Sequence, residues 1–309
     1  MSEIKPLVAI HCLVYNHEPY LRECFEGFVM QQTNFPFVAI VHDDASTDNS
    51  AAIIHEYEAK YPHIFKPIYE KDNLYQSGGF ADINEVMNAA IDATGAKYVA
   101  MCEGDDYWTD SLKLQKQVNF MEENEEYSIC FHKVSALIQE TGELMEEFGV
   151  RDMPGTSTIL DLAEENYIHT PSVMYRREML SFDKLTKLLP CLPLDYVVWM
   201  LLSEKGKIFK LTETMAIYRY GSGIWSTKLG EYKDINAIRT LCTLWLHFNS
   251  NAIRIRLQQQ LCNIFYSKNF SLEDINIYKQ IEHFYSSSTY RLGNFLIKPF
   301  KFIKKALKK

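Results

Sequence analysis

Three carboxylates lie within four residues of the sequence, Glu103-Gly104-Asp105-Asp106, directly after the apolar run Tyr98–Cys102. Negative charges this close repel one another unless a cation lies among them. Oxygen ligands of this kind favour Mg2+ or Mn2+, and such ions usually complete their shell with water and substrate phosphates. The cluster therefore predicts a divalent metal and a diphosphate ligand. The alternative is a solvated acidic turn at the start of the next helix.

A second acidic pair, Asp43 and Asp44, follows the apolar run Phe37–Val41. A carboxylate in this place could accept a hydrogen bond from a nucleobase N–H or from a ribose hydroxyl, as acidic residues do in dinucleotide sites. The pair also fits an Asx-type turn that leads through Ser46 into the next helix. The sequence leaves both interpretations open.

Asp195 interrupts the apolar run from Cys191 to Leu202. A charge in such a run is costly unless it is paired, hydrogen-bonded or facing a cavity. Burial would raise the proton affinity of this carboxylate and suit it to act as a general base near neutral pH. The alternative is a helix N-cap after Pro193.

A sheet must position these residues, because short apolar runs alternate with helical patterns from Leu7 to Val134. That alternation predicts an α/β fold with mainly parallel strands joined by crossover helices. The predicted strands are Leu7–Val14, Phe37–Val41, Ile64–Tyr69, Tyr98–Cys102 and Ser128–Val134. The predicted helices are Pro19–Gln32, Asn49–Tyr61, Ala81–Thr94 and Ser111–Glu123. Since ligands bind beyond the carboxyl ends of parallel strands, the acidic residues should meet at one edge.

The second half of the chain is less regular. Apolar segments at Ser172–Tyr175 and Leu194–Leu202 should complete the sheet and cover it, and helical patterns follow at Ile235–Phe248 and Ala252–Tyr266. We therefore expect two parts, a sheet domain over residues 1–228 and a helical C-terminal region over residues 229–309. No GxGxxG follows the first strand and no GxxxxGK[ST] occurs, which excludes an ordinary dinucleotide-binding fold and a P-loop enzyme.

The composition of the 309 residues, 47% hydrophobic and 23% charged, is that of an ordinary soluble globular protein. The longest mostly apolar stretch, from Cys191 to Leu202, is too short to span a bilayer, and the N-terminus lacks the pattern of an export signal. Seven scattered cysteines without a CxxC pair indicate reduced thiols. We therefore expect a cytoplasmic location.

Charge is distributed unevenly along the chain. The net charge is −8, yet the tail Lys298–Lys309 holds six lysines and no acid, which leaves −14 on the rest. An acidic body repels nucleic acid, so we expect no nucleic-acid partner. One helical stripe in and just before this tail is apolar and comprises Leu296, Phe300, Ile303 and Leu307. This basic amphipathic segment could hold the protein peripherally on an anionic membrane, at the inner face of the cell membrane. The alternative is a merely solvated terminus.

A family resemblance is carried by three stretches, VAIHCLVYNHEPYLRECFEGFVMQQ, FVAIVHDDASTDNS and NAAIDATGAKYVAMCEGDDYWTDSLKLQKQ. In order and spacing they strongly resemble the family-2 inverting glycosyltransferases with the GT-A fold. The resemblance covers Pro6 to Phe131 and continues more weakly to Ser226 through HTPSVMYRRE, LPLDYVVWMLLSEKG and AIYRYGSGIWS. It implies a single Rossmann-like, mixed, mainly parallel sheet flanked by helices, with a helical C-terminal extension. Residues 1–228 would then bind the nucleotide-sugar and carry out catalysis.

On the donor side, the resemblance assigns Tyr15 and Asp44 to the nucleotide base, with Asp43 as a further donor-binding residue. Asp105 would bind the ribose or the donor sugar. Asp106 would coordinate the metal that bridges the diphosphate, and Glu103 stands where the family has its first acid, as a second metal ligand.

On the acceptor side, the resemblance makes Asp195 the general base, ahead of an aromatic-rich helix. His169 falls in a segment that resembles an acceptor-facing loop. Trp108 and Trp225 would offer ring faces to sugars, and core packing is the alternative for both rings.

Two departures from the family pattern concern the donor phosphates. Many relatives have a histidine in a YRxH-like stretch, whereas Tyr218-Arg219-Tyr220-Gly221 has none, and Arg219 could meet phosphate instead. The basic residue often found just before Asn88, which we count among the donor-binding residues, is replaced by Met87.

The resulting hypothesis is a metal-dependent transfer of a sugar from a nucleotide-diphosphate donor, a UDP-sugar foremost, to an acceptor hydroxyl with inversion. The acceptor would be a glycan or a lipid-linked molecule in the synthesis of a cell-surface polysaccharide or glycoconjugate. One alternative is a sugar nucleotidyltransferase, which would carry a glycine-rich, basic loop where this sequence has Tyr15-Asn16-His17-Glu18. The other is a non-catalytic sugar-nucleotide-binding or membrane-docking module of the same fold.

Overall fold

A mixed sheet organises the computed structural model, which describes residues 5–77, 80–146, 148, 155–189, 191, 193–223 and 230–267. Within these residues the strands lie in the order β3 (Phe65–Tyr69), β2 (Phe37–Asp43), β1 (Val8–Val14), β4 (Tyr98–Met101), β9 (Met174–Arg176), β6 (Tyr127–Ile138), β10 (Lys207–Tyr220) and β5 (Tyr107–Trp108). Off this path, β7 (Leu144–Met145) pairs with β6 and β8 (Thr156–Ser157) pairs with β10.

The direction of the strands is mainly parallel. β3, β2, β1 and β4 pair in parallel, and β6 and β10 are parallel to each other. β9 is antiparallel to both of its neighbours, β4 and β6, and β5 is antiparallel to β10. The sheet is therefore mixed and mainly parallel, as the sequence predicts.

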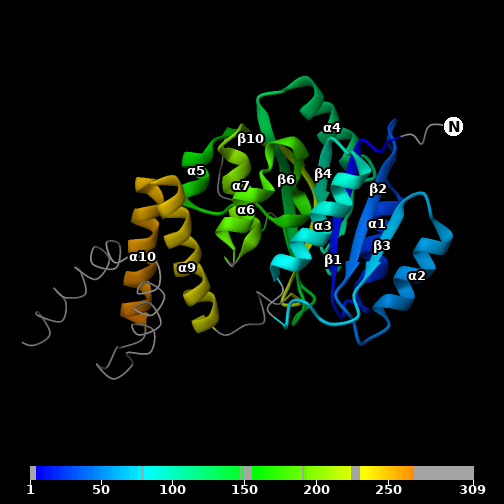
Figure 1. Ribbon diagram of the computed structural model, residues 1–309, viewed down its shortest axis with the longest axis horizontal. Helices are drawn as coiled ribbons and strands as arrows, with labels where there is room; N and C mark the ends of the chain where they lie inside the picture. Colours follow the sequence, from blue (N-terminus) through cyan, green and yellow to red (C-terminus); the bar gives the residue numbers. More distant parts are fainter. Residues whose placement is uncertain are drawn as a thin grey trace, which may run out of the picture. The chain divides into compact units, whose positions relative to one another are not determined.

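Helices cover both faces of the sheet (Figure 1). One face carries α1 (Leu21–Val29), α2 (Ser50–Lys60) and α4 (Lys113–Glu123). The other face carries α3 (Phe80–Thr94), α6 (Phe182–Leu188) and α7 (Leu194–Ser203), which lie in front of the strands in Figure 1. The remaining elements are α5 (Ile159–Glu164), the short helical turns η1 (Thr170–Ser172) and η2 (Arg177–Met179), α9 (Gly230–Phe248) and α10 (Asn251–Ser267).

The main core lies between the sheet and the face that α1 and α2 cover. Ile10 of β1 packs there with Phe25 of α1 and Ile54 of α2, and all three are buried. The Phe25 ring meets the Phe65 ring of β3 edge-on, with the ring centroids 4.8 Å apart. Full burial of one such side chain stabilises the fold by about 2 kcal/mol, so these contacts fix the sheet on which the site is built.

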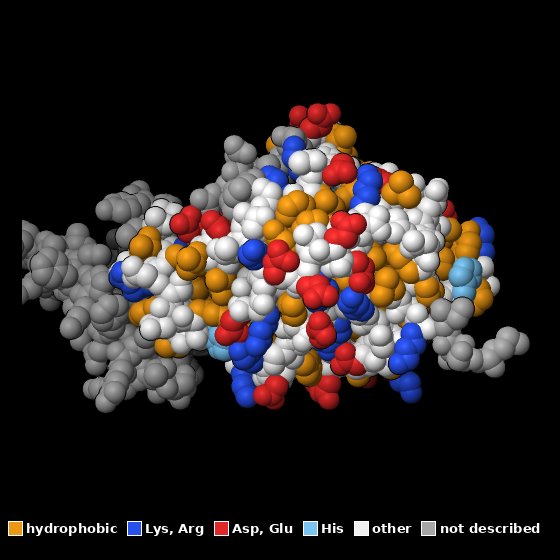
Figure 2. Space-filling model, turned by 90° about the horizontal axis from the view of Figure 1, so that it is seen from above, with side chains coloured by type: hydrophobic (Ala, Val, Ile, Leu, Met, Phe, Trp, Pro, Cys, Tyr) orange, Lys and Arg blue, Asp and Glu red, His pale blue; other side chains and the backbone are white. Residues whose placement is uncertain are grey.

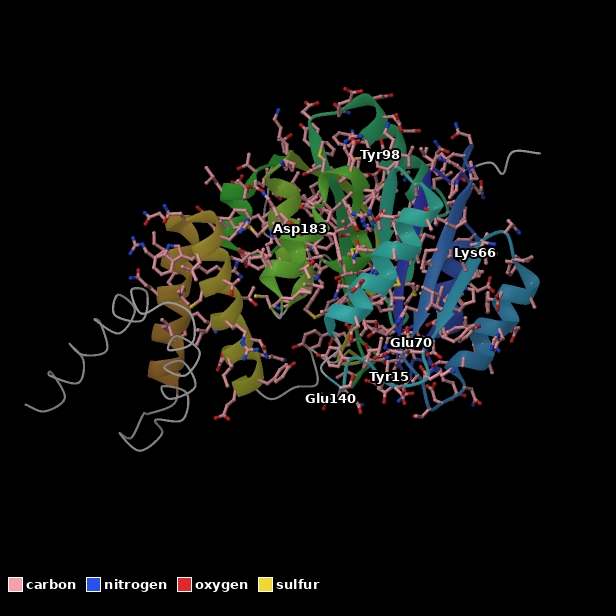
Figure 3. All side chains as sticks on the ribbon, in the orientation of Figure 1. Tyr15, Lys66, Glu70, Tyr98, Glu140 and Asp183 are labelled. Carbon is pink, nitrogen blue, oxygen red and sulfur yellow. The ribbon has the colours of Figure 1, made fainter. Side chains whose placement is uncertain are left out.

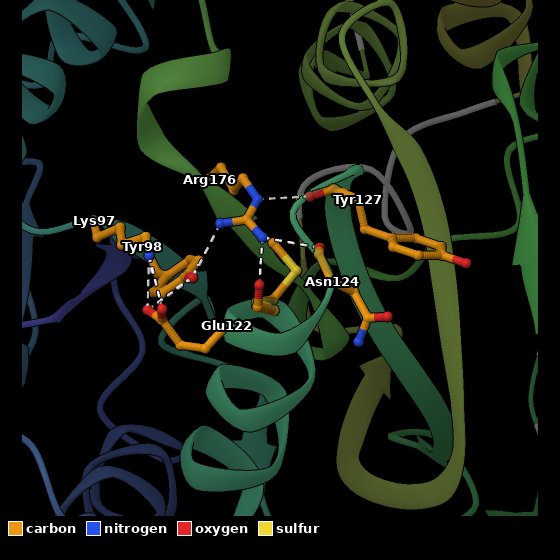
Figure 4. A network of polar contacts seen from close by, with 7 residues as sticks. Lys97, Tyr98, Glu122, Asn124, Tyr127 and Arg176 are labelled. Atoms are coloured by element: carbon orange, nitrogen blue, oxygen red, sulfur yellow. Dashed lines mark hydrogen bonds and ion pairs between the residues drawn. The ribbon is translucent and has the colours of Figure 1, made fainter.

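A buried arginine joins the middle of the sheet to the end of α4 (Figure 4). Arg176 of β9 donates to the carbonyls of Tyr127 at 2.8 Å, Asn124 at 3.0 Å and Met121, and to the hydroxyl of Tyr98 at 3.1 Å. A buried guanidinium is costly unless its donors are satisfied. These hydrogen bonds therefore hold β9 in place, and η1 directly precedes that strand.

The outer surface seen in Figure 2 intermixes acidic, basic and apolar side chains. Among the residues that the structure describes, this face presents no continuous basic area. No helix of the described part is both long and apolar enough to cross a membrane.

The strands and helices predicted between Leu7 and Val134 are all present, with somewhat different ends. The sequence does not predict β10, the strand that completes the site. The chain divides into two units, Met1–Leu257 and Gln258–Lys309, and the boundary predicted at residue 228 stays a prediction. Two predicted functional elements, Trp225 and the basic tail Lys298–Lys309, lie outside the described residues.

Candidate active site

Polar residues that follow the parallel strands lie at one edge of the sheet. Tyr15 after β1, Glu70 after β3 and Glu140 after β6 lie along this edge in Figure 3, whereas Tyr98, at the start of β4, lies at the opposite edge. Parallel pairing of β2 and β4 with β1 brings the acidic ends of those strands to the same edge as Tyr15. The site is therefore assembled from loops that are far apart in the sequence.

The loops after β1 and β2 are joined by side-chain hydrogen bonds. Ser46 accepts the N–H of Asn16 at 2.9 Å, and the side chain of Asn16 accepts the N–H of Thr47 at 2.7 Å. Asn16 and Ala45 have left-handed backbone conformations, with φ of 55° and 56°, a strain that the surrounding contacts must maintain. Asp43 belongs to this turn, because its Oδ1 accepts the N–H of Ser46 at 3.2 Å. This contact is the Asx-type turn that the sequence left open.

Asp44 points instead toward the segment after β3. Its two carboxylate oxygens accept the backbone N–H groups of Leu74 and Tyr75 at 2.7 and 3.1 Å. Gln76 of the same segment donates to the hydroxyl of Tyr15 at 3.2 Å. Asp44 and Tyr15 therefore form one wall of the site together with residues 74–76.

The acidic turn after β4 approaches the loop after β1 very closely. A Cβ atom on Gly104 would lie 2.8 Å from Nδ1 of His17, 3.0 Å from Val14 and 3.1 Å from Leu21. At distances this short, a larger residue would force its neighbours or the turn to shift. The glycine of the EGDD segment therefore serves to seat its carboxylates against the end of β1.

The end of β10 holds two carboxylates of the acidic turn. Asp106, 2% exposed, accepts the backbone N–H of Arg219 at 2.8 Å. Asp105, 4% exposed, accepts the hydroxyl of Ser222 at 2.8 Å. The strand that the sequence does not predict thus fixes the orientation of the predicted metal and donor ligands.

Burial raises the proton affinity of two acids in this turn, Glu103 and Asp106. Burial, followed by the negative charges of Asp105 and Asp195, raises the pKa of Glu103 to about 8. Burial also raises the pKa of Asp106 well above its usual range, although the N–H of Arg219 opposes the shift. Burial therefore favours the protonated forms of Glu103 and Asp106, and a bound cation would favour their charged forms.

Asp195 lies in the first turn of α7, behind the N-cap residue Pro193. Its Oδ1 accepts the N–H of Tyr196 at 2.6 Å, and the hydroxyl of Thr170 approaches its Oδ2 at 3.4 Å. Burial raises the pKa of Asp195 to about 6, and these two hydrogen bonds oppose that rise. Asp195 is therefore not the N-cap that the alternative interpretation expects. It has the proton affinity of a base that works near neutral pH.

Tyr218 of β10 lies within electrostatic reach of both the acidic turn and Asp195. Burial, and then the charges of Asp106, Glu103, Asp105 and Asp195, raise the pKa of its phenol. The phenol is thus neutral, and it lies in the same electrostatic environment as all four carboxylates.

His169 lies in an aromatic cluster on the Asp195 side of the site. Its ring centroid is 5.4 Å from that of Tyr218 and 5.3 Å from that of Phe148, and Phe148 also contacts Tyr220. Burial lowers the pKa of His169 to about 4. The imidazole is therefore neutral at pH 7, and this position has no positive charge to offer to phosphate.

The structure places two predicted ligand residues in other contacts, Trp108 in the core and Arg219 in an ion pair. Trp108 is 2% exposed and its ring packs on Phe28 and under the amine of Lys113, so no ring face is open to a sugar. Arg219 is 5% exposed, and its guanidinium pairs with Glu23. The positive charge of Arg219, which was expected to contact phosphate, is therefore paired with the Glu23 carboxylate.

Asn88 is not joined to the other predicted residues by a hydrogen bond that the structure gives. Its side-chain amide donates to the carbonyl of Asn84 at 2.7 Å within α3. This contact is the ordinary i to i−4 back-bond of a polar helical side chain. A role for Asn88 in donor binding stays a prediction.

The donor set of the acidic turn fits a divalent metal only if substrate completes the shell. The described residues include no group of three or more His, Cys, Asp or Glu side chains that could enclose a metal by themselves. Glu103 and Asp106 are nevertheless hard oxygen donors with raised proton affinity. Such a pair fits a Mg2+ or Mn2+ ion that takes the rest of its shell from water and a diphosphate.

Comparison with known families identifies the chain. The sequence profile of glycosyl transferase family 2 matches residues 10–181, which is more than half of the sequence. The chain belongs to glycosyl transferase family 2. This family-2 glycosyltransferase is 39% identical to an uncharacterised protein of Mycobacterium tuberculosis over 219 residues, which make up 71% of this chain and 60% of that protein. The chain thus spans about three fifths of that relative's length.

Two further kinds of relative give this family-2 glycosyltransferase a context. A glycosyltransferase of Bacillus subtilis that is assigned provisionally to teichuronic acid biosynthesis is 26% identical over 268 residues, 83% of this chain and 100% of that protein. The crystal structure of S. aureus TarS 1–349 in complex with UDP matches with a TM-score of 0.60 at 18% identity, over 89% of this chain and 77% of that one. This likeness confirms the predicted GT-A fold, and the sequence profile confirms the predicted family.

Three residues of the site were missed by sequence reasoning. Thr170 contacts Asp195, Ser222 contacts Asp105, and Tyr218 lies within electrostatic reach of all four carboxylates. The signal for Ser222 and Tyr218 was their place in the AIYRYGSG segment. The signal for Thr170 was its place in the HTPSVMYRRE segment.

Proposed function

We propose that this glycosyltransferase moves a sugar from a nucleoside-diphosphate donor, with a UDP-sugar as the first choice, to an acceptor hydroxyl and inverts the anomeric configuration. One observation carries the proposal. Asp195, whose pKa is raised to about 6, shares one electrostatic environment with Glu103, Asp105 and Asp106. A one-step displacement needs one general base close to the site that binds the diphosphate of the donor.

The nucleotide of the donor is placed against Tyr15 and Asp44. Each oxygen of Asp44 accepts one loop amide and keeps a second lone pair for a base N–H or a ribose hydroxyl. Support for a UDP-sugar comes from the TarS structures, which hold UDP and UDP-GlcNAc. The mannosyltransferase PcManGT from Pyrobaculum calidifontis, with a TM-score of 0.52 at 12% identity, was solved with GDP-Man and Mn2+, so GDP-sugars belong among the donors to be tested.

The chemical step is a displacement at the anomeric carbon of the donor sugar. The acceptor oxygen forms a bond to this carbon while its proton passes to the Asp195 carboxylate. The bond between the carbon and the diphosphate oxygen breaks, and its electron pair leaves with the nucleoside diphosphate. Because the acceptor attacks from the face opposite the leaving group, one displacement inverts the configuration.

A divalent cation bound by Asp106, with Glu103 as the second ligand, would supply charge stabilisation to the departing diphosphate. Hydrogen bonds within the chain already hold the carboxylates of this metal site in position. The Arg219 N–H fixes Asp106, and the Ser222 hydroxyl fixes Asp105. Positioning of this kind supplies a large part of the acceleration in transfer reactions.

The proposed acceptor is a glycan or a lipid-linked molecule of the cell surface. The names of two relatives support this class, the teichuronic acid protein above and a poly(ribitol-phosphate) beta-glucosyltransferase of Bacillus spizizenii, which is 26% identical over 184 residues, 58% of this chain and 26% of that protein. The neutral ring of His169 and the half-exposed ring of Tyr220 are suited to line the acceptor side. A cytoplasmic enzyme held on the membrane by Lys298–Lys309 would match such an acceptor.

The test is a donor panel followed by product stereochemistry. The chain is incubated with UDP-glucose, UDP-galactose, UDP-GlcNAc and GDP-mannose, each with Mn2+ or with EDTA, and release of the nucleoside diphosphate is measured. We expect release with one donor, and only when Mn2+ is present. The anomeric configuration of the product is then determined by NMR. A product that retains the donor configuration would overturn the role of Asp195, and equal release in EDTA would overturn the role of the metal.

A further inference from the structure

The turn η1, whose Thr170 approaches Asp195, is held through its carbonyl groups. Ser172 donates both its hydroxyl and its N–H to the carbonyl of His169, at 2.6 and 3.0 Å, and the N–H of Val173 donates to the carbonyl of Thr170 at 3.2 Å. A turn of three residues has no further N–H groups for its own last carbonyls. The carbonyls of Pro171 and Ser172 must therefore find partners elsewhere.

Two buried side chains supply these partners. The indole N–H of Trp108 donates to the carbonyl of Pro171 at 2.9 Å. The side-chain amide of Gln117 on α4 donates to the carbonyl of Ser172 at 2.9 Å and to the carbonyl of Cys130 on β6 at 2.8 Å. Both side chains are almost fully buried, with Trp108 2% and Gln117 0% exposed. These bonds are directional, so they fix the position of η1 more sharply than apolar packing would.

Lys113 fixes the orientation of the Gln117 amide. Its amine donates to Oε1 of Gln117 at 2.7 Å and lies 4.2 Å from the centre of the Trp108 ring. Because Lys113 is 0% exposed and an ammonium or amine on this side donates to Oε1, the two amide hydrogens of Gln117 are left to face the carbonyls. The three side chains thus form one network, which we call the Trp108–Lys113–Gln117 network.

This network joins the two halves of the site. Trp108 is two residues beyond Asp106, the predicted metal ligand. At the other end, the hydroxyl of Thr170 in η1 approaches Oδ2 of Asp195 at 3.4 Å. A shift of η1 would therefore move the group that contacts the base while the acidic turn stays where it is.

We propose that Trp108 and Gln117 are positioning residues for the transfer reaction, which hold η1 so that Thr170 orients the Asp195 carboxylate toward the acceptor. The proposal rests on the proposed function, in which Asp195 is the base. Neither Trp108 nor Gln117 touches substrate. They act on the rate through η1, and they leave the nucleotide wall at Tyr15 and Asp44 unchanged.

The main test compares Gln117→Leu with a matched control, Gln31→Leu. Gln31 is a second buried glutamine, 8% exposed, whose amide donates to two carbonyls, Gly27 at 3.1 Å and Asp110 at 2.8 Å. Its Oε1 accepts the N–H of Leu114 at the start of α4, and none of these contacts involves η1. Each variant is measured for thermal unfolding, for UDP affinity in the presence of Mn2+, and for the rate of nucleoside diphosphate release at saturating donor.

We expect Gln117→Leu to lower the rate on the order of 10-fold or more, because a small misplacement of a reacting group is costly, while UDP affinity changes less than about 2-fold. Gln31→Leu should lose comparable thermal stability and keep its rate. An equal loss of rate in Gln117→Leu and Gln31→Leu would mean that the network contributes only to stability, and it would overturn the proposal.

Two milder variants keep the test decisive if Gln117→Leu does not fold. Trp108→Phe keeps a ring and removes the N–H to Pro171, and Thr170→Val removes only the hydroxyl near Asp195. We expect both to lower the rate with unchanged UDP affinity, and Thr170→Ser, which restores a hydroxyl, to recover most of the rate. Wild-type rates in Trp108→Phe and Thr170→Val would overturn the proposal.

Failure of the proposed function is recognised separately. If Asp195→Asn keeps the wild-type rate, then Asp195 is not the base and the proposed function fails, whatever the network variants do. If Asp195→Asn is inactive while the network variants are as fast as the wild type, only the positioning role fails. In the Asp195→Asn background, the network variants should have no further effect on the residual rate, because the group they position is gone.

Discussion

The nucleotide side and the base side of the site are built in different ways. On the nucleotide side, which comprises Tyr15, Asp44 and residues 103–106, each functional residue directly follows a strand of the parallel sheet. On the base side, which comprises Thr170, Asp195 and Tyr218, the residues come from a short turn, a helix start and a late strand. A regular sheet can therefore place a nucleotide with local loops, whereas the base depends on contacts between distant segments.

The two sides also treat negative charge differently. Each oxygen of Asp44 accepts a backbone N–H, from Leu74 and from Tyr75. Asp195 has one backbone N–H and one long contact to a hydroxyl, and burial raises its pKa to about 6. A carboxylate that only binds can be held by backbone N–H groups, whereas a carboxylate that takes a proton needs a pKa near the working pH. We expect variants of the two sides to separate binding from rate.

The largest expected effect comes from Asp195→Asn. An amide cannot take the acceptor proton, so the rate at saturating donor should fall on the order of 10³-fold, within the range that general-base catalysis supplies. UDP affinity with Mn2+, measured by calorimetry, should stay close to wild type, because Asp195 lies outside the nucleotide side.

The control for this variant is Asp183→Asn in the neighbouring helix α6. The side chain of Asp183 is 85% exposed and pairs with Lys187, so its loss should leave both the rate and the affinity unchanged. A large loss of UDP affinity in Asp195→Asn would show that Asp195 also contributes to nucleotide binding, which would contradict the division into two sides.

The difference between the two sides also explains which strands could be predicted from the sequence. β1, β2 and β4 were predicted because buried strands of a parallel sheet are continuous apolar runs. β10 was not predicted, because Lys207–Tyr220 holds the polar stretch Thr212-Glu213-Thr214, which is exposed. Its strand conformation comes from pairing with β6, whose register with β10 shifts between Lys210 and Thr214, and a shift of this kind leaves no periodic signal.

The site was predictable to the same degree. The acidic strand ends could be found from their place after apolar runs, whereas the direction of each side chain could not. Asp43 turns into its own loop and Asp44 turns toward residues 74–75, although both are the same residue type. Arg219 was expected at phosphate, yet it pairs with Glu23 of α1, at the opposite end of the sheet domain's sequence. Such pairings arise only when the sheet brings the partners together.

A second prediction tests the metal ligand of the nucleotide side. Asp106→Asn removes the charge of the proposed metal ligand and keeps its shape, including the acceptor for the Arg219 N–H. Loss of a ligand charge should weaken UDP binding in Mn2+ on the order of 10²-fold, while UDP binding in EDTA stays the same. Calorimetric titration of UDP with and without Mn2+ measures both values. An unchanged metal dependence would remove Asp106 from the metal site.

A third prediction concerns the close approach at Gly104. Gly104→Ala places a Cβ 2.8 Å from His17 Nδ1 and 3.0 Å from Val14, and overpacking of this kind costs about 1 to 3 kcal/mol. We expect a lower denaturant midpoint together with weaker UDP binding in Mn2+, because the acidic turn must move. Gly142→Ala is the control for glycine replacement at a site with no atom within 4 Å, although its φ of 71° adds strain of its own. Full stability of Gly104→Ala would show that the turn can shift freely.

The smallest effect is on the pH dependence of the rate, and it bears on the base side alone. The charged form of Asp195 accepts the proton, and burial raises its pKa from 3.8 to about 6. The rate at saturating donor should therefore be constant above about pH 7 and fall about 10-fold per unit as the pH drops below 6. The Thr170 hydroxyl stabilises the charged form and lowers this pKa, so Thr170→Val should move the midpoint to higher pH by a few tenths of a unit, on the order expected for one weak hydrogen bond. A midpoint that moves to lower pH would mean that the hydroxyl stabilises the protonated acid, and Thr170 would then be orienting a proton donor instead of a base.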